Sequence, residues 1–91
     1  MASIRLLKKD INYLTSELIM QAYTNQLLFD KSDDELEKSV TKAIDFHSDL
    51  FGRLKPSIDK NDKKAIRKHY SKLREDMLTN FKSLYEAEDS Q

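Results

Sequence analysis

The chain has 91 residues and no net charge, because sixteen Lys and Arg residues balance sixteen Asp and Glu residues. It contains one Gly, one Pro and no Cys, which excludes disulfides, thiolate metal sites and cysteine nucleophiles and favours long helices over tight turns. This length and composition fit a single domain of the all-α class.

The first predicted helix spans residues 4–29 and carries two apolar stripes. The first stripe recurs at spacings of three and four residues: Ile4, Leu7, Ile11, Leu14, Leu18 and Ala22. The second recurs every seven residues, with Tyr23 near it: Leu6, Tyr13, Met20 and Leu27. A helix with two apolar faces needs neighbours on two sides, so this helix is predicted to be the central one, with the rest of the chain wrapped on it.

The second predicted helix spans residues 33–54. Ser32 and Glu35 match the S-x-x-E capping box, and acidic residues in the first turn suit the helix dipole. Pro56 is predicted to end the helix, because the residue before a proline avoids the α conformation. The predicted core-facing stripe is Leu36, Val40, Ala43, Ile44, His47, Leu50, Phe51 and Leu54.

The third predicted helix spans residues 62–85, with Asn61 as a candidate N-cap and a polar tail over residues 87–91. Its apolar seam is Ile66, Tyr70, Leu73, Met77, Phe81 and Leu84. Long amphipathic helices joined by short breaks predict an up-down-up antiparallel bundle of three helices. The second stripe of the first helix exceeds what two neighbours can bury, so either a homodimer through this face or a kink in the helix would account for the surplus.

The sequence offers little for catalysis. With Gly52 as the single glycine, a P-loop, a dinucleotide-binding fingerprint and a nucleophile elbow are excluded, and no Glu-x-x-His, H-E-x-x-H or EF-hand pattern occurs. His47 is a candidate acid/base or metal ligand, but a half-buried histidine bonded to a neighbouring side chain is the favoured interpretation. Asp45 and Asp49 share a helix face that His47 does not. We therefore expect no enzyme activity and no catalytic, cofactor or metal site.

A basic run is the main alternative feature. Its members on the third helix are Lys63, Lys64, Arg67, Lys68, Lys72 and Arg74. Such a face can contact phosphates of a nucleic acid. A solvated outer face is favoured instead, because Asn, Gln and aromatic residues for base reading are lacking apart from Tyr70, and because acidic residues of the second helix can pair with the basic ones.

The expected function is a non-catalytic helical interaction or scaffold domain, whose partner is another protein or a second copy of the chain. The candidate interface is Leu6, Tyr13, Met20, Tyr23 and Leu27. The alternative is a nucleic-acid-binding accessory protein that uses the basic run. The start of the chain has no signal-peptide pattern and no apolar run is long enough to span a membrane, so a cytoplasmic location without a membrane partner is expected.

Two stretches resemble a known group of proteins. Lys8 to Ile19 reads K-K-D-I-N-Y-L-T-S-E-L-I, and His69 to Leu78 reads H-Y-S-K-L-R-E-D-M-L. These resemble small uncharacterised helical proteins from Bacteroides-type bacteria, in which a similar D-I-N-Y-L opening precedes acidic and then basic helices. The resemblance implies an all-helical domain, and it implies no activity and no site residues.

Overall fold

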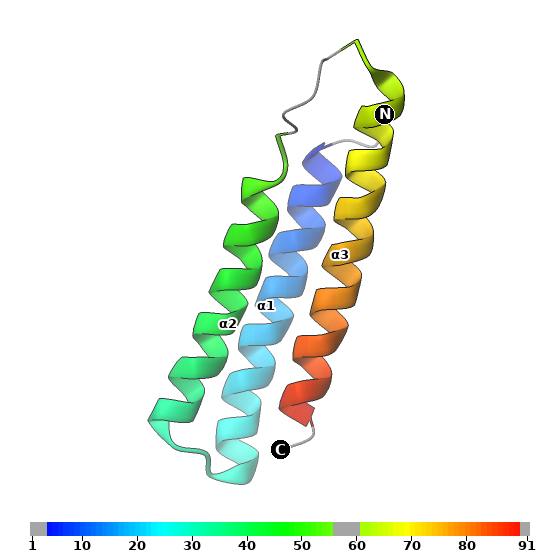
Figure 1. Ribbon diagram of the computed structural model, residues 1–91. Coiled ribbons are helices and arrows are strands. Elements are labelled where there is room, and N and C mark those ends of the chain that lie inside the picture. The colour runs from blue at the N-terminus through cyan, green and yellow to red at the C-terminus, as the bar shows by residue number, and fades with distance from the viewer. Residues whose placement is uncertain (1–3, 56–60, 90–91) are drawn as a thin grey trace.

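The computed structural model describes residues 4–55 and 61–89, which form an up-down-up bundle of three α-helices (Figure 1). The helices are α1 (Ile4–Phe29), α2 (Asp33–Gly52) and α3 (Lys63–Asp89). The bundle is a rod with extents of 53 × 17 × 16 Å. As predicted, α1 contacts both other helices, and it does so more extensively than α2 and α3 contact each other.

The turn between α1 and α2 is fixed by local polar contacts. Asp30 takes a left-handed conformation with φ of 52°, which an Asp tolerates better than most residues. The Ser32 hydroxyl oxygen accepts a hydrogen bond from the Glu35 backbone N–H at 3.2 Å, as the capping box predicts. Gln26 Nε2 donates to Asp33 Oδ1 at 2.9 Å, so the end of α1 is tied to the start of α2.

The other helix ends differ from the predictions. The second helix ends at Gly52, because the N–H groups of Arg53 and Leu54 bond back to carbonyls three residues earlier and tighten the last turn. Leu54 nevertheless stays buried beyond the helix end. The predicted stop at Pro56 lies outside the described residues.

The N-cap of α3 is Asp62 rather than Asn61. Asp62 Oδ1 accepts from the Ala65 N–H at 3.0 Å, which satisfies one of the free donors of the first turn. The helix continues through 87–89, where a polar tail was predicted, because Glu and Ala are strong helix formers and no Gly or Pro interrupts them. Residues 90–91 of the predicted tail lie outside the described residues.

The core lies between the first stripe of α1, the seam of α3 and one side of α2. Its buried members are Leu7, Ile11, Leu18, Ala43, Phe46, Leu50, Leu54, Leu73 and Met77. The prediction was wrong for one pair on α2, since Ile44 is 52% exposed and Phe46 only 6%. The Phe46 ring packs towards Phe81 of α3, with 6.5 Å between ring centroids. The buried side of α2 is therefore rotated towards α3, because α2 packs on two neighbours and not on α1 alone.

Candidate functional site

The second stripe of α1 forms an exposed apolar surface. Its residues, which we call the outer face of α1, are Leu6 (55% exposed), Tyr13 (63%), Met20 (61%), Tyr23 (52%) and Leu27 (84%). Both neighbouring helices pack on the side of α1 that carries the first stripe, where Leu7, Ile11 and Leu18 are buried. α2 and α3 therefore cover the first stripe and leave the second in contact with solvent, in line with a second stripe larger than two neighbours can bury.

The outer face of α1 is also poor in charge. Between Ile11 and Phe29 the sequence has a single charged residue, the half-buried Glu17. A solvent-exposed helix side is normally rich in charged residues. The exposed side of α2, which carries Lys42, Asp45 and Asp49, is an example. The outer face of α1 thus differs in composition from the ordinary solvated side of a bundle helix.

The apolar surface extends onto α3. Gln21 Nε2, next to Met20, donates to the backbone oxygen of Tyr85 at 3.3 Å, so the two helices touch at this level. Tyr85 is 38% exposed, and Leu78, two turns earlier on α3, is 55% exposed. Both residues lie beside the predicted apolar seam of α3, and spacing within this helix does not show which side of it α1 covers.

His47 is held by a hydrogen bond and by ring stacking. Its Nε2 lies 2.7 Å from Asn12 Oδ1, and its ring stacks on Phe51 with 4.1 Å between centroids and 22° between planes. The half-buried, hydrogen-bonded state is the one favoured from sequence; the structure identifies the partner as Asn12, which the sequence did not indicate. Within residues 4–55 and 61–89, no group of three His, Asp or Glu side chains is placed to hold a metal ion.

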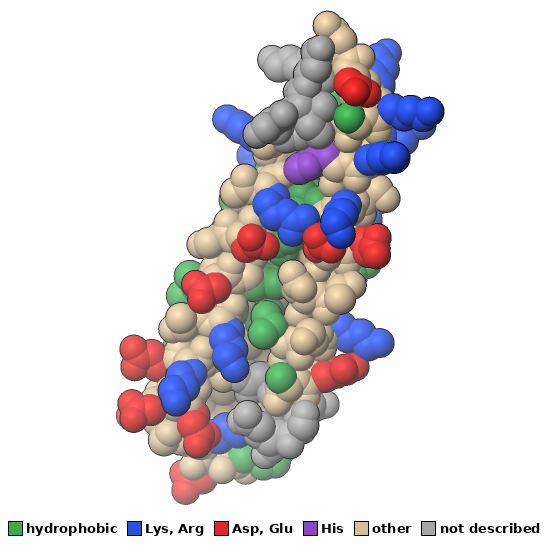
Figure 2. Space-filling model, viewed as in Figure 1, with side chains coloured by type: hydrophobic (Ala, Val, Ile, Leu, Met, Phe, Trp, Pro, Cys, Tyr) green, Lys and Arg blue, Asp and Glu red, His purple; other side chains and the backbone are tan. Residues whose placement is uncertain are grey.

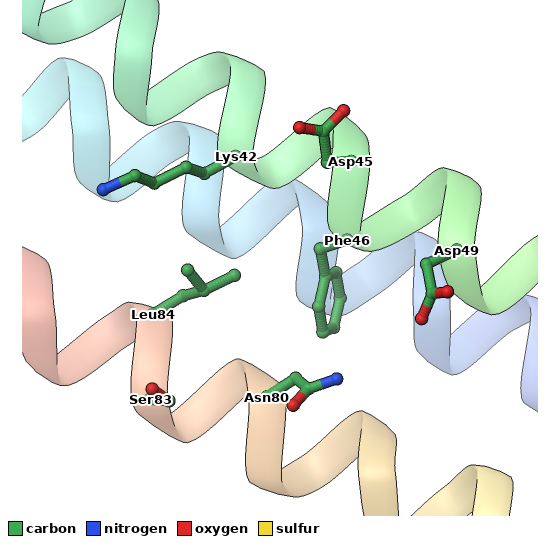
Figure 3. Close-up of a pocket in the computed structure, with 7 residues that line it drawn as sticks. All are labelled: Lys42, Asp45, Phe46, Asp49, Asn80, Ser83 and Leu84. Atoms are coloured by element: carbon green, nitrogen blue, oxygen red, sulfur yellow. The ribbon is translucent and has the colours of Figure 1, made fainter.

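An open groove of about 270 Å³ lies between α2 and α3 (Figure 3), and its lining is Lys42, Asp45, Phe46, Asp49, Asn80, Ser83 and Leu84. Figure 2 shows hydrophobic side chains, flanked by charged ones, along the boundary between α2 and α3. As predicted, Asp45 and Asp49 share a side of α2 that His47 does not. The structure shows that His47 points to α1 instead. Ser83 therefore has no imidazole beside it among the residues that line the groove. Sequence reasoning missed the groove because it depends on how two helices are juxtaposed.

A polar cluster joins the C-terminal end of α2 to the middle of α3. Arg53 contacts Asp76 at 2.7 Å and Asp49 at 3.7 Å, and Lys72 contacts Asp76 at 3.5 Å. The hydrogen bond from Arg53, opposed by burial and aided by the charge of Lys72, holds the pKa of Asp76 below its ordinary value. The cluster therefore fastens two helices and is not arranged as an acid/base couple.

His69 and Tyr70 satisfy carbonyl groups after the end of α2. His69 Nε2 lies 2.7 Å from the Arg53 carbonyl oxygen, which can only accept, so this nitrogen carries the proton. The Tyr70 hydroxyl donates to the Leu54 carbonyl at 3.0 Å. Both side chains replace the helical partners that these carbonyls lack, which gives His69 a structural role.

The predicted basic patch is exposed throughout. Its members, which lie on the first half of α3, are Lys63, Lys64, Arg67, Lys68, Lys72 and Arg74. Lys64, Lys68 and Lys72 recur every four residues along one side, and Lys72 belongs to the cluster with Asp76. Figure 2 shows Lys and Arg side chains crowding the upper end of the molecule, where α3 begins.

Comparison with protein-family models, curated proteins and solved structures finds no significant match for this chain. The resemblance to helical proteins of Bacteroides-type bacteria stays a prediction. Over the described parts of α1, α2 and α3, no stretch combines the length and the apolar character that crossing a lipid bilayer requires.

Proposed function

We propose that this protein is a non-catalytic interaction or scaffold domain that binds another protein chain through the outer face of α1. The observation that carries this proposal is the row of exposed apolar side chains from Leu6 to Leu27, on a helix that has no exposed charged residue between Ile11 and Phe29. Isolated apolar residues on a surface need no explanation, but a contiguous apolar patch on a folded domain marks an interaction site.

The composition of the outer face supports a protein partner. Tyr and Met are enriched at the centres of protein interfaces, while charged residues are depleted there. Tyr13 and Tyr23 have large, stiff side chains. Their hydroxyl groups can form hydrogen bonds with water in the free protein and with a polar group of the partner in the complex. A helix face of this kind fits against a second helix or into an apolar groove.

In-cell photo-cross-linking tests the proposal. A photoreactive phenylalanine analogue replaces Tyr13 in one variant and Thr41, exposed on α2, in a control. We expect covalent adducts from position 13 and few from position 41. Equal yields from the two positions would remove the support for an interaction surface on α1, and the adduct masses would report whether the partner is a second copy or another protein.

We propose nucleic-acid binding as the second candidate function, because six cationic side chains are exposed together on the first half of α3. A mobility assay at low salt with single- and double-stranded probes tests it. Binding that is lost in Lys64→Glu/Lys68→Glu but kept in the α2 control Lys38→Glu/Lys42→Glu would support a phosphate-contacting face. Equal binding by both variants, or none by the unmodified protein, would contradict it.

A further inference from the structure

The two ends of the rod carry opposite charge. The end where α1 and α3 begin holds an excess of basic residues: Arg5, Lys8, Lys9, Arg53, Lys55, Lys63, Lys64, Arg67 and Lys68. The opposite end holds an excess of acidic residues: Asp30, Asp33, Asp34, Glu35, Glu37 and Glu86. The charges of opposite sign are fewer: Asp10, Asp49 and Asp62 at the basic end, and Lys31, Lys38 and Lys82 at the acidic end. Figure 2 shows the acidic side chains around the start of α2 and the basic ones at the other end.

We propose that the partner of the outer face of α1 is a second copy of this chain, docked side by side and antiparallel about a two-fold axis. This inference rests on the proposed function and specifies its partner. Antiparallel docking brings the basic end of each copy beside the acidic end of the other, which complementary potentials favour. Parallel docking would set like charges against each other at both ends. A closed two-fold pair also covers the same patch on both copies and leaves no second apolar face to propagate a filament.

The positions of the apolar residues fit this symmetry. The sequence midpoint of Leu6 and Leu27 falls between Ser16 and Glu17, and so does the midpoint of Tyr13 and Met20. The midpoint of α1 itself, Ile4–Phe29, falls at the same place. A two-fold axis at this point therefore pairs Leu6 with Leu27 and Tyr13 with Met20 of the second copy, while the two α1 helices overlap over their full length.

Lys9 adds a further preference for the antiparallel arrangement. It is exposed on the same side of α1 as the outer face, four residues before Tyr13. In parallel docking Lys9 would stand opposite Lys9 of the second copy. In the antiparallel pair it stands opposite the uncharged Thr24, so the two Lys9 side chains are kept apart.

The long side of the rod approaches the area of a standard protein interface. The two α1 helices, of 26 residues each, would overlap over about 39 Å, and a side 17 Å wide then spans roughly 660 Å², against about 800 Å² per partner in a standard interface. The ends, at 17 × 16 Å, are far too small. Of the sides of the bundle, the one made by α1 carries the most exposed large hydrophobic residues.

Thiol cross-linking of single-Cys variants tests the arrangement, since the chain has no Cys of its own. We expect Ser16→Cys to form a covalent dimer with a short bismaleimide, because this residue lies next to the axis. Leu6→Cys and Leu27→Cys should each react poorly alone, because two identical positions stand about 32 Å apart at 1.5 Å per residue. A mixture of these two variants should cross-link efficiently. Self-cross-linking of Leu6→Cys and of Leu27→Cys would instead show a parallel pair and overturn the proposal.

Light scattering coupled to size exclusion provides an independent readout. We expect the mass of a dimer for the unmodified chain and at least a tenfold higher dissociation constant for Met20→Glu, with Thr41→Glu on α2 unchanged. A monomeric mass at micromolar concentration, together with no cross-linking at Ser16→Cys, would overturn the second copy as partner. If photo-cross-linking at position 13 then gave adducts with a different protein, the proposed interaction function would stand. If it gave none, both would fall.

Discussion

The substitution Phe46→Ala tests which side of α2 faces the core. The Phe46 side chain is 6% exposed and packs towards the ring of Phe81, so its removal leaves a cavity between α2 and α3. Truncating a buried Phe costs about 3–5 kcal/mol of unfolding free energy. A domain of 91 residues has roughly 5–14 kcal/mol in total, so the loss is a large fraction of it. At about 4–8 °C per kcal/mol, the melting temperature should fall by at least roughly 12 °C.

Ile44→Ala is the matched control on the same helix. Ile44 is 52% exposed, so its truncation removes little buried apolar surface. The higher helix propensity of Ala offsets about 0.4 kcal/mol of the resulting loss in unfolding free energy. We expect a cost below about 1 kcal/mol. Urea unfolding followed by far-UV circular dichroism, at one protein concentration and with the m-values compared, measures both variants. A larger cost for Ile44→Ala than for Phe46→Ala would refute the orientation of α2 and restore the one that spacing alone suggests.

Three smaller perturbations test individual contacts. Ser32→Ala should cost about 1 kcal/mol in urea unfolding, because the Glu35 N–H loses its acceptor at the start of α2. Thr15→Val should be neutral or stabilising by about 1 kcal/mol in the same assay, because Thr15 Oγ1 is buried without a hydrogen-bond partner among the described residues. A clear loss of stability would contradict this and show that the Thr15 hydroxyl forms a hydrogen bond. The lowered pKa of Asp76 means that its carboxylate stabilises the fold above pH about 4, its ordinary pKa, and that this contribution is lost as pH falls through the folded-state value. Asp76→Asn should therefore flatten the acid limb of stability against pH, and an unchanged limb would contradict the coupling to Arg53.

The sequence was sufficient for α1 and for the topology. The seven-residue repeat of Leu6, Tyr13, Met20 and Leu27 identified a second apolar face, and the structure leaves these side chains exposed. The capping box at Ser32 located the start of α2, because its hydrogen bond involves neighbours in the chain. Features that depend on local spacing could thus be predicted from the sequence alone.

Features that depend on the relative placement of helices could not be predicted from the sequence. Ile44 and Phe46 lie on opposite margins of the stripe of α2, and the direction of α3 decides which of them is buried. The groove beside Asn80 depends in the same way on how α2 and α3 lie against each other. The cap of α3 is different in kind: Asn61 and Asp62 are both good N-caps, and where the first turn begins selects one of them.

The uneven packing of α1 on its two neighbours has a consequence for how the protein opens. The more extensively packed pair, α1 and α2, is also joined by the short turn around Ser32, so the two form a local hairpin with little loop-closure entropy. The third helix docks on it with less contact. Native-state hydrogen exchange should accordingly show the amides of α3 exchanging at a lower opening free energy than those at the centres of α1 and α2. Undocking of α3 would expose Phe46 and Leu50 to solvent while α1 and α2 stay together. The partly open form of this protein is therefore an α-hairpin whose core-facing residues on both helices are accessible.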